Sequence, residues 1–236
     1  MDFSLTGNVA GMKAFLASHG METLSCWAME SSLDEMRLAG LADVNLVVSA
    51  AGIPPAMELE RKYGTPYVVG TPVGRRAALR LAGLLRLGAG TGKSQSLFAG
   101  GNGHRDPSGG PWGGPAGSWA LSGLPEDLSG EHILIVGEQV IAGSLRCSLR
   151  EDLGAGDIHV LCPTEGGADL AEPGDILVWD EDEAIAAMEK STVVIADPLY
   201  RQVCPGDGRQ VFVDFPHEAC SGRMYHDRMK PFVCGV

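Results

Sequence analysis

Polar side chains stand directly after several of the short apolar runs that are typical of β-strands. Ser49 follows NLVV, Thr71 follows YVVG, Asp197 follows VVIA, and His217 follows VFVDFP. In open α/β sheets, ligands bind beyond the carboxyl ends of the strands. If these ends converge on one cleft, they offer hydroxyl, carboxylate and imidazole groups to a ligand. We therefore predict a ligand site formed by these four residues.

The segment HEACSG adds a thiol to this set, because Cys220 lies three residues after His217. An imidazole and a thiolate together can serve a metal ion or a metal cluster. The competing interpretation is a hydrogen-bonding surface histidine beside a free thiol. The spacing alone leaves both open.

Two predicted helix starts can bind an anion. Each follows a glycine, Gly74 or the Gly222 of Ser221–Gly222, and arginines stand beside both, with Arg75 next to the first. The free N–H groups of a helix start favour a carboxylate, and a guanidinium strengthens that preference. Solvated arginines at the two helix starts are the alternative.

Two nucleotide-binding motifs are incomplete. GAGTGKS lacks the first glycine of a phosphate-binding loop, since Leu87 stands five positions before Gly92, and a helix precedes it where a strand is required. IVGEQVIAGS has Gly137 and Gly143 but not the full GxGxxG pattern. These departures argue against a nucleotide or dinucleotide site.

Alternation of strand and helix patterns predicts an α/β fold with parallel sheets flanked by helices. In the first half we expect helices over residues 8–19, 32–39, 55–63 and 75–87, and strands over 22–27, 45–49 and 66–69. In the second half we expect helices over residues 139–153 and 182–190, and strands over 133–136, 157–162, 175–179, 192–196 and 210–215. The halves match in order, which predicts two Rossmann-like layers that face a shared cleft.

Glycine, serine and proline are concentrated between the two halves, where burial cannot offset the entropy of ordering. We therefore expect a Rossmann-like domain over residues 1–87, a glycine-rich linker or loop over 88–130, and a second Rossmann-like domain over 131–236.

The net charge and the apolar content of the chain argue against several classes of function. A net charge of −12 argues against nucleic acid and anionic membrane surfaces. No stretch approaches the ~20 apolar residues of a membrane span, and the amino terminus lacks a secretory pattern, so we expect a cytoplasmic protein. The six dispersed cysteines predict free thiols.

The residues also resemble a known family, the nitrogenase component 1 type oxidoreductases. The run LDEMRLAGLADVNLVVSAAGIPPAMELERKYGTPYVVGTPVGRRAALRLAGLL is similar to the family's NLV-x-C stretch and the helix that follows it. LSGEHILIVGEQVIAGSLRCSLREDLG resembles the family's LEGK-strand-G-helix-LG unit, and FPHEACSGRMYH resembles its terminal MHSWDYSGPYH segment.

This resemblance implies that the chain corresponds to the carboxyl-terminal two of the family's three Rossmann-like layers. The chain would then be either part of a longer protein or a shortened relative. It implies electrons from an ATP-dependent iron protein, a homologous subunit or homodimer, and an iron–sulfur or related metallocluster, or a bound tetrapyrrole. Ser49 stands where the nitrogenase catalytic subunit has a cysteine ligand, and His217 matches its histidine ligand. A serine hydroxyl is a poor iron ligand beside a thiolate.

Three functions remain at this point. The first is part of an oxidoreductase, not active alone, that lines a cleft for a metallocluster or a tetrapyrrole-like substrate. The second is a non-catalytic scaffold or carrier for metallocofactor assembly. The third is a bilobed small-molecule binder.

Overall fold

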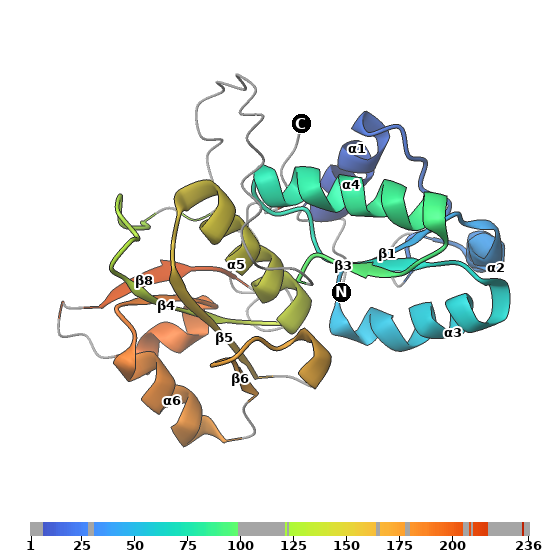
Figure 1. Cartoon of the computed structure of the whole chain (residues 1–236). Helices are drawn as coiled ribbons and strands as arrows, with labels where there is room; N and C mark the ends of the chain where they lie inside the picture. The colour runs from blue at the N-terminus through green and yellow to red at the C-terminus, as the bar shows by residue number, and fades with distance from the viewer. Residues whose placement is uncertain are drawn as a thin grey trace.

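The chain forms two α/β lobes joined along one helix, α5 (Gln139–Leu153), as Figure 1 shows. The structure is a computed structural model. It describes residues 7–27, 31–98, 121, 123–163, 166–177, 180–204, 208, 210–216 and 233. Both sheets are entirely parallel, which confirms the predicted α/β class with Rossmann-like layers.

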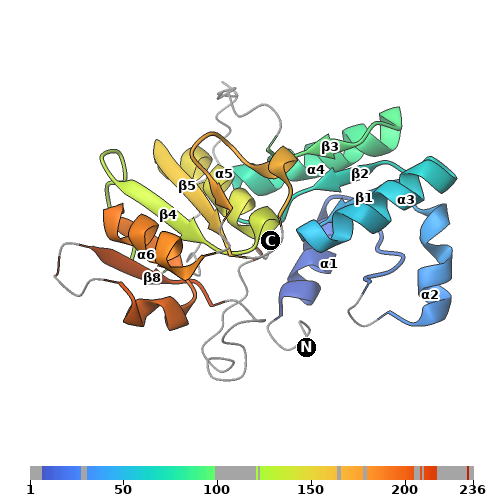
Figure 2. The ribbon, with the colours of Figure 1, turned by 90° about the horizontal axis from the view of Figure 1, so that it is seen from below.

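The first lobe holds a three-stranded sheet in the order β1-β2-β3. Its strands are β1 (Asn45–Val47), β2 (Tyr67–Val69) and β3 (Gln95–Ser96). Its helices are α1 (Asn8–Ser18), α2 (Leu33–Arg37), η2 (Leu38–Leu41), η3 (Ala50–Gly52), α3 (Ile53–Tyr63) and α4 (Arg76–Thr91). Adjacent residues of β2 point to opposite faces, so Val68 packs with α4 and Val69 with α3. The two helices therefore cover opposite faces of the sheet (Figure 2).

The second lobe holds a five-stranded sheet in the order β6-β5-β4-β7-β8. Its strands are β4 (His132–Val136), β5 (Asp157–Cys162), β6 (Ile176–Leu177), β7 (Val193–Ala196) and β8 (Val211–Asp214). The remaining elements are η4 (Ala168–Leu170), α6 (Glu181–Lys190) and η5 (Pro198–Gln202). The chain builds outward from β4 on one side and then returns to build on the other. Numbered by their appearance in the chain, the strands follow the order 3-2-1-4-5, which is the classic Rossmann order without its sixth strand.

Local sequence signals explain most element boundaries. Ser32 and Glu35 form a capping box at the start of α2, where each side chain accepts the other residue's backbone N–H. Gly64 and Gly154 end α3 and α5 with φ of 73° each, a conformation that glycine adopts without a Cβ penalty. The helix 139–153 and the strand 157–162 are confirmed at both ends.

Two expectations for the first lobe were wrong. Residues 22–27 form no strand, and Leu24 and Trp27 are exposed instead of lying in a sheet. Helix α4 does not end at residue 87 but runs to Thr91, because Gly88 continues its buried face against Val68. Strand β3 then pairs with β2 inside the segment that we assigned to a linker.

Helix α5 is buried on every side between the lobes. Residues Gln139 through Leu149 are all buried. Ile141, Leu145 and Leu149 pack on one face of the second sheet. Val140 joins a cluster with Val47, Ala56 and Val69 of the first lobe, and Cys147 joins the cluster around Leu81 and Leu97. The two lobes therefore share their cores along this helix.

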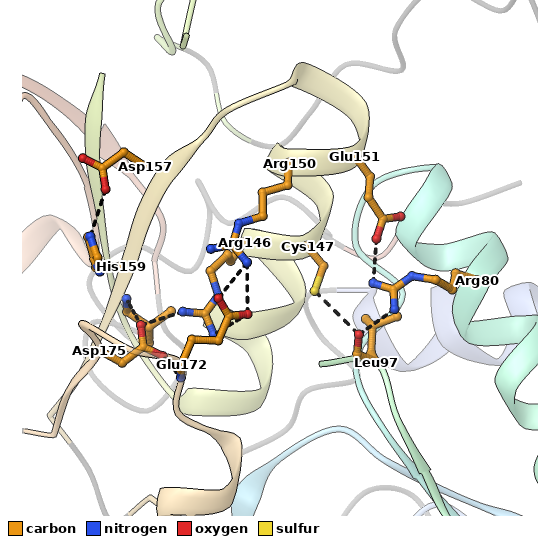
Figure 3. Close-up of polar contacts among 11 residues, drawn as sticks. Arg80, Leu97, Arg146, Cys147, Arg150, Glu151, Asp157, His159, Glu172 and Asp175 are labelled. Carbon is orange, nitrogen blue, oxygen red and sulfur yellow. Dashed lines mark hydrogen bonds and ion pairs between the residues drawn. The ribbon is translucent and has the colours of Figure 1, made fainter. Parts of the chain in front are cut away.

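Polar residues of α5 are buried with partners. Figure 3 shows Arg146 and Cys147, adjacent in sequence, on opposite sides of the helix. The Arg146 side chain, 1% exposed, donates to Asp175 Oδ1 at 2.5 Å and lies 3.2 Å from Glu172. Asp175 also accepts the backbone N–H groups of Val160 and Glu172, both at 2.8 Å. This ion pair fixes the loop before β6 against α5.

We expect Arg146→Ala to lower the free energy of unfolding by about 3–5 kcal/mol, because it leaves a buried carboxylate without its cation. Arg37→Ala breaks an ion pair whose side chains are 77% and 86% exposed. That control should cost less than about 1 kcal/mol. Urea unfolding of both variants measures the difference, and equal costs would contradict the buried pair's role.

The close approach of α5 to the first lobe gives a second prediction. A Cβ on Gly143 would lie 2.9 Å from Phe98 Cε1, whereas a Cβ on Gly83 in α4 meets nothing within 4 Å. Gly143→Ala should therefore destabilise by about 1–3 kcal/mol despite its better helix propensity. Gly83→Ala should stabilise by about 0.5–1 kcal/mol. Similar shifts in the two urea midpoints would refute the tight contact.

Candidate functional site

The carboxyl ends of strands from both lobes come together at one place. The backbone N–H of Ala50, just after Ser49, donates to Glu138 Oε1 at 2.7 Å. Glu138 itself follows the last residue of β4 by two positions. The end of β1 in one lobe thus lies against the end of β4 in the other. This contact is the centre of the candidate site.

Glu138 also begins α5. Its other oxygen, Oε2, accepts the N–H groups of Val140 and Ile141 at 3.1 Å each. One carboxylate therefore caps a helix and holds the opposite lobe. The sequence contained a usable signal, because an acidic residue between a strand end and a helix start stands in a capping position. We did not single it out.

The direction in which the chain adds strands to the second sheet reverses between β4 and β7, at this same edge. Its order places β4 beside β7, the two strands from which the chain builds in opposite directions. Ligands of doubly wound sheets bind at such a switch point. Asp197 follows β7, is 2% exposed, and caps η5 by accepting the N–H of Leu199 at 3.0 Å. It therefore lies at the predicted strand end, where its carboxylate caps η5.

Ser49 and Thr71 differ in how far they are committed to structural contacts. Thr71 is buried, its N–H donates to Ser144 Oγ of α5 at 2.8 Å, and its hydroxyl donates to Val48 O at 3.4 Å. Ser49 is half-buried and begins η3 without a side-chain capping bond. Of the two, Ser49 has the more available hydroxyl.

The helix start after Gly74 does bind a carboxylate, and that carboxylate belongs to the chain itself. The N–H groups of Arg75 and Arg76 donate to Asp152 Oδ2 at 2.7 Å and Oδ1 at 3.1 Å. Gly74 has φ of 67°, which turns the chain into α4. Asp152, near the end of α5, was not among our sequence candidates. A single sequence gives no sign that α5 and α4 meet there.

A second set of polar contacts joins the same two helices. Arg80 of α4 donates to Glu151 Oε1 at 2.6 Å and to Leu97 O at 2.7 Å (Figure 3). The Cys147 thiol contacts the same Leu97 oxygen at 3.8 Å. Burial raises the pKa of the Cys147 thiol, so this group stays protonated. Its side chain packs in the cluster around Leu81 and Leu97.

His217, Cys220, Ser221 and Gly222 lie outside the described residues. The described chain reaches Phe215 and Pro216, just past β8, where the N–H of Phe215 donates to Ala196 O at 2.7 Å. It resumes at Val233, which forms an antiparallel bridge with Val73 in the first lobe. The roles expected for these four residues stay predictions.

The described side chains at this edge do not by themselves fit a metallocluster. Ser49, Thr71 and Asp197 supply hydroxyls and one carboxylate but no thiolate, the ligand that iron–sulfur clusters require. Within the described ranges, just one group of three His, Cys, Asp or Glu side chains can share a metal ion, and it contains none of these residues. Any cluster held here would need ligands from elsewhere.

The fold and this edge define a doubly wound α/β protein with its strand ends turned toward a second α/β lobe. Residues 1–96 match the family model of the nitrogenase component 1 type oxidoreductases. This match covers the first lobe through the last residue of β3. The first lobe is therefore a nitrogenase component 1-like oxidoreductase-type domain, and the resemblance is confirmed for that part of the chain. No curated protein and no solved structure gave a significant match.

The expectation that the chain has no membrane span can be compared with the structure. Across the described parts of the chain, none of the helices combines the length and the apolar character needed to cross a bilayer.

The Asp152 contact can be tested directly. Asp152→Ala leaves two N–H groups at the start of α4 without their acceptor, so we expect unfolding free energy to fall by about 1–2 kcal/mol. Glu183→Ala removes an exposed acidic residue from the first turn of α6 and should change it by less than about 0.5 kcal/mol. Urea unfolding at low salt compares them. Equal free energies of unfolding for the two variants would mean that the Asp152 contact does not contribute to stability.

Proposed function

We propose that this chain is part of a nitrogenase component 1-like oxidoreductase and that the facing strand ends of its lobes line the substrate site. The observation that carries the proposal is the hydrogen bond between Ala50 and Glu138, which brings the carboxyl ends of β1 and β4 together. Ser49 is the residue before this contact. In the resemblance, its position corresponds to a cofactor ligand of the catalytic subunit.

The described residues favour a tetrapyrrole-like substrate over a thiolate-bound metallocluster. Ser49 is followed by Ala50, Ala51 and Gly52, which carry only small side chains or none. The two helix starts nearest this edge are already capped by Glu138 and Asp152. A bound ligand would therefore meet hydroxyls and small apolar groups, which suits a largely apolar macrocycle.

The position of β8 supports a role for His217. This strand lies two places from β4 in the sheet, a distance of about 10 Å at normal strand spacing. His217 follows Pro216 directly in the sequence, after the carboxyl end of β8. A macrocycle is wide enough to span from the carboxyl end of β4 to the carboxyl end of β8.

Electron delivery requires a partner in this proposal. The residues that the structure describes hold no group suited to carry electrons, so an ATP-dependent iron protein would donate them in the cytoplasm. A homologous subunit or a second copy of the chain would complete the assembly. The site would act by excluding water and by presenting fixed dipoles to the reduced ligand.

The packing of α5 distinguishes this proposal from a bilobed binder. Binders that close around a ligand need a hinge between lobes that separate. Here the lobes share buried clusters along α5, so closure would have to break apolar contacts.

A scaffold or carrier for metallocofactor assembly remains the second candidate. It differs in function by loading and transferring a cluster without turnover.

The proposal is tested by binding and turnover. The protein is isolated anaerobically, analysed for iron and sulfide, and titrated with tetrapyrroles while its absorption is followed. We expect a bound tetrapyrrole, and its reduction when an iron protein and ATP are added. Cluster loading and transfer without turnover would select the carrier, and absence of both ligands would refute an oxidoreductase site.

His217→Ala and Ser49→Ala should each lower ligand occupancy severalfold while the melting temperature stays within a few degrees. His19→Ala is the matched control, because His19 lies at the end of α1 and hydrogen-bonds Phe15 O. Its occupancy should equal that of the unmodified protein. A His217→Ala variant with full occupancy would remove this residue from the site.

A further inference from the structure

Three potential metal ligands meet at the other edge of the second sheet. His132 is the first residue of β4, and Asp157 is the first residue of β5. His132 Nδ1 lies 2.8 Å from Asp157 Oδ2, and His159 Nε2 lies 2.9 Å from Asp157 Oδ1. All three ligand atoms lie within 4.8 Å of one another. Each imidazole thus directs one nitrogen toward the same carboxylate.

Strand register explains why these side chains gather. His132 pairs with Asp157, and Leu134 pairs with His159. Residues i and i+2 of a strand share a face, so all three side chains project from the same side of the sheet. Farther along that face, Leu134 and Val136 are buried under α6. The cluster lies beyond this cover, and its side chains are 37%, 59% and 27% exposed in chain order.

The backbone holds the His159 ring in place. Gly174 has φ of 93°, and a Cβ built on it would lie 2.5 Å from both Cε1 and Nδ1 of the imidazole. The ring therefore occupies space that only glycine leaves open. One edge of the ring is buried against this turn, and Nε2 faces Asp157 (Figure 3). A ligand atom is thus presented in a fixed direction.

We propose that His132, Asp157 and His159 form a binding site for a divalent first-row transition-metal ion, with Zn²⁺ as its representative. Two imidazoles and one carboxylate suit such ions, whereas Mg²⁺ and Ca²⁺ prefer all-oxygen sites. The protein supplies three ligands, and water or another molecule completes the coordination.

Binding needs only small side-chain movements. Zinc binds nitrogen and oxygen at about 2.0–2.2 Å, so ligand atoms around it stand about 3.4 Å apart. The two histidine–carboxylate contacts must lengthen by roughly half an ångström, and the two imidazoles must approach each other. His132 and Asp157, which are more exposed than His159, can make this adjustment. The ion would replace the hydrogen-bonding protons between Asp157 and the two histidines.

The buried edge of His159 limits the affinity. His159 Nδ1 is buried without a hydrogen-bond partner among the described residues. Metal-bound histidines normally donate the other ring N–H to an acceptor. The missing acceptor should weaken binding by roughly 10–100-fold relative to a fully supported site. We therefore expect a dissociation constant in the micromolar range.

This site is separate from the proposed substrate site. It lies at the amino ends of β4 and β5, and Glu138 lies six residues further along the chain, beyond the carboxyl end of β4. At ~3.3 Å per residue, β4 alone separates the two edges by about 13 Å. An ion here would bridge β4 and β5 through its ligands and thereby stabilise the second lobe.

Untagged protein is stripped with a chelator and titrated with Zn²⁺ against a chromophoric competitor. We expect binding in the micromolar range and a rise in melting temperature with zinc. His132→Ala, His159→Ala and Asp157→Asn should each weaken binding at the cluster at least about 10-fold. His19→Ala should bind as the unmodified protein does. Unchanged affinity in all three cluster variants would overturn the proposal.

Other histidines and cysteines of the chain can also take up zinc, so a second set of measurements locates the ion. The double variant His217→Ala with Cys220→Ser should retain the micromolar site. If this double variant loses zinc binding while the three cluster variants keep it, the proposal is overturned. In the unmodified protein, zinc should shift the ring ¹⁵N signals of His132 and His159. Zinc that leaves these signals unmoved would be bound elsewhere, which also rejects the site, even if one variant fails to fold.

Discussion

The burial of α5 between two sheets is the constraint on which the rest of the structure depends. A helix that is buried all round is usually apolar all round. This helix instead carries Ser144, Arg146 and Ser148 inside the protein, each with a hydrogen-bond partner. Its apolar residues serve both lobes, and its polar residues fix which surface meets each lobe. The relative position of the two sheets follows from these contacts.

Both ends of α5 use a carboxylate for the same purpose. Glu138 at its start accepts an N–H from η3, and Asp152 near its end accepts two N–H groups from the start of α4. Helix starts are natural anion sites, so an enzyme can use them for substrates. Here the chain satisfies them itself. In the proposed function, these two helix starts would therefore not be available to a substrate.

The sequence predicted most elements because periodicity and caps are local. The start of α2 and both ends of α5 follow from such signals. Residues 22–27 have an apolar pattern but no partner strand among the described residues, and partners cannot be read from one segment. Ser49, Thr71 and Asp197 do follow strands, whereas the Asp152 contact depends on how helices cross. The pairing of His132 with Asp157 depends likewise on sheet register.

The bridge between Val73 and Val233 has a consequence for how the protein is made. The chain leaves the first lobe, builds the second, and returns so that Val233 packs on Gly11 and hydrogen-bonds Asn8, 225 residues away. Domains usually fold during synthesis from the amino terminus. In this protein the amino-terminal lobe gains the buried side chain of Val233 only after the whole second lobe has been synthesised, so the first lobe cannot complete this contact from its own residues.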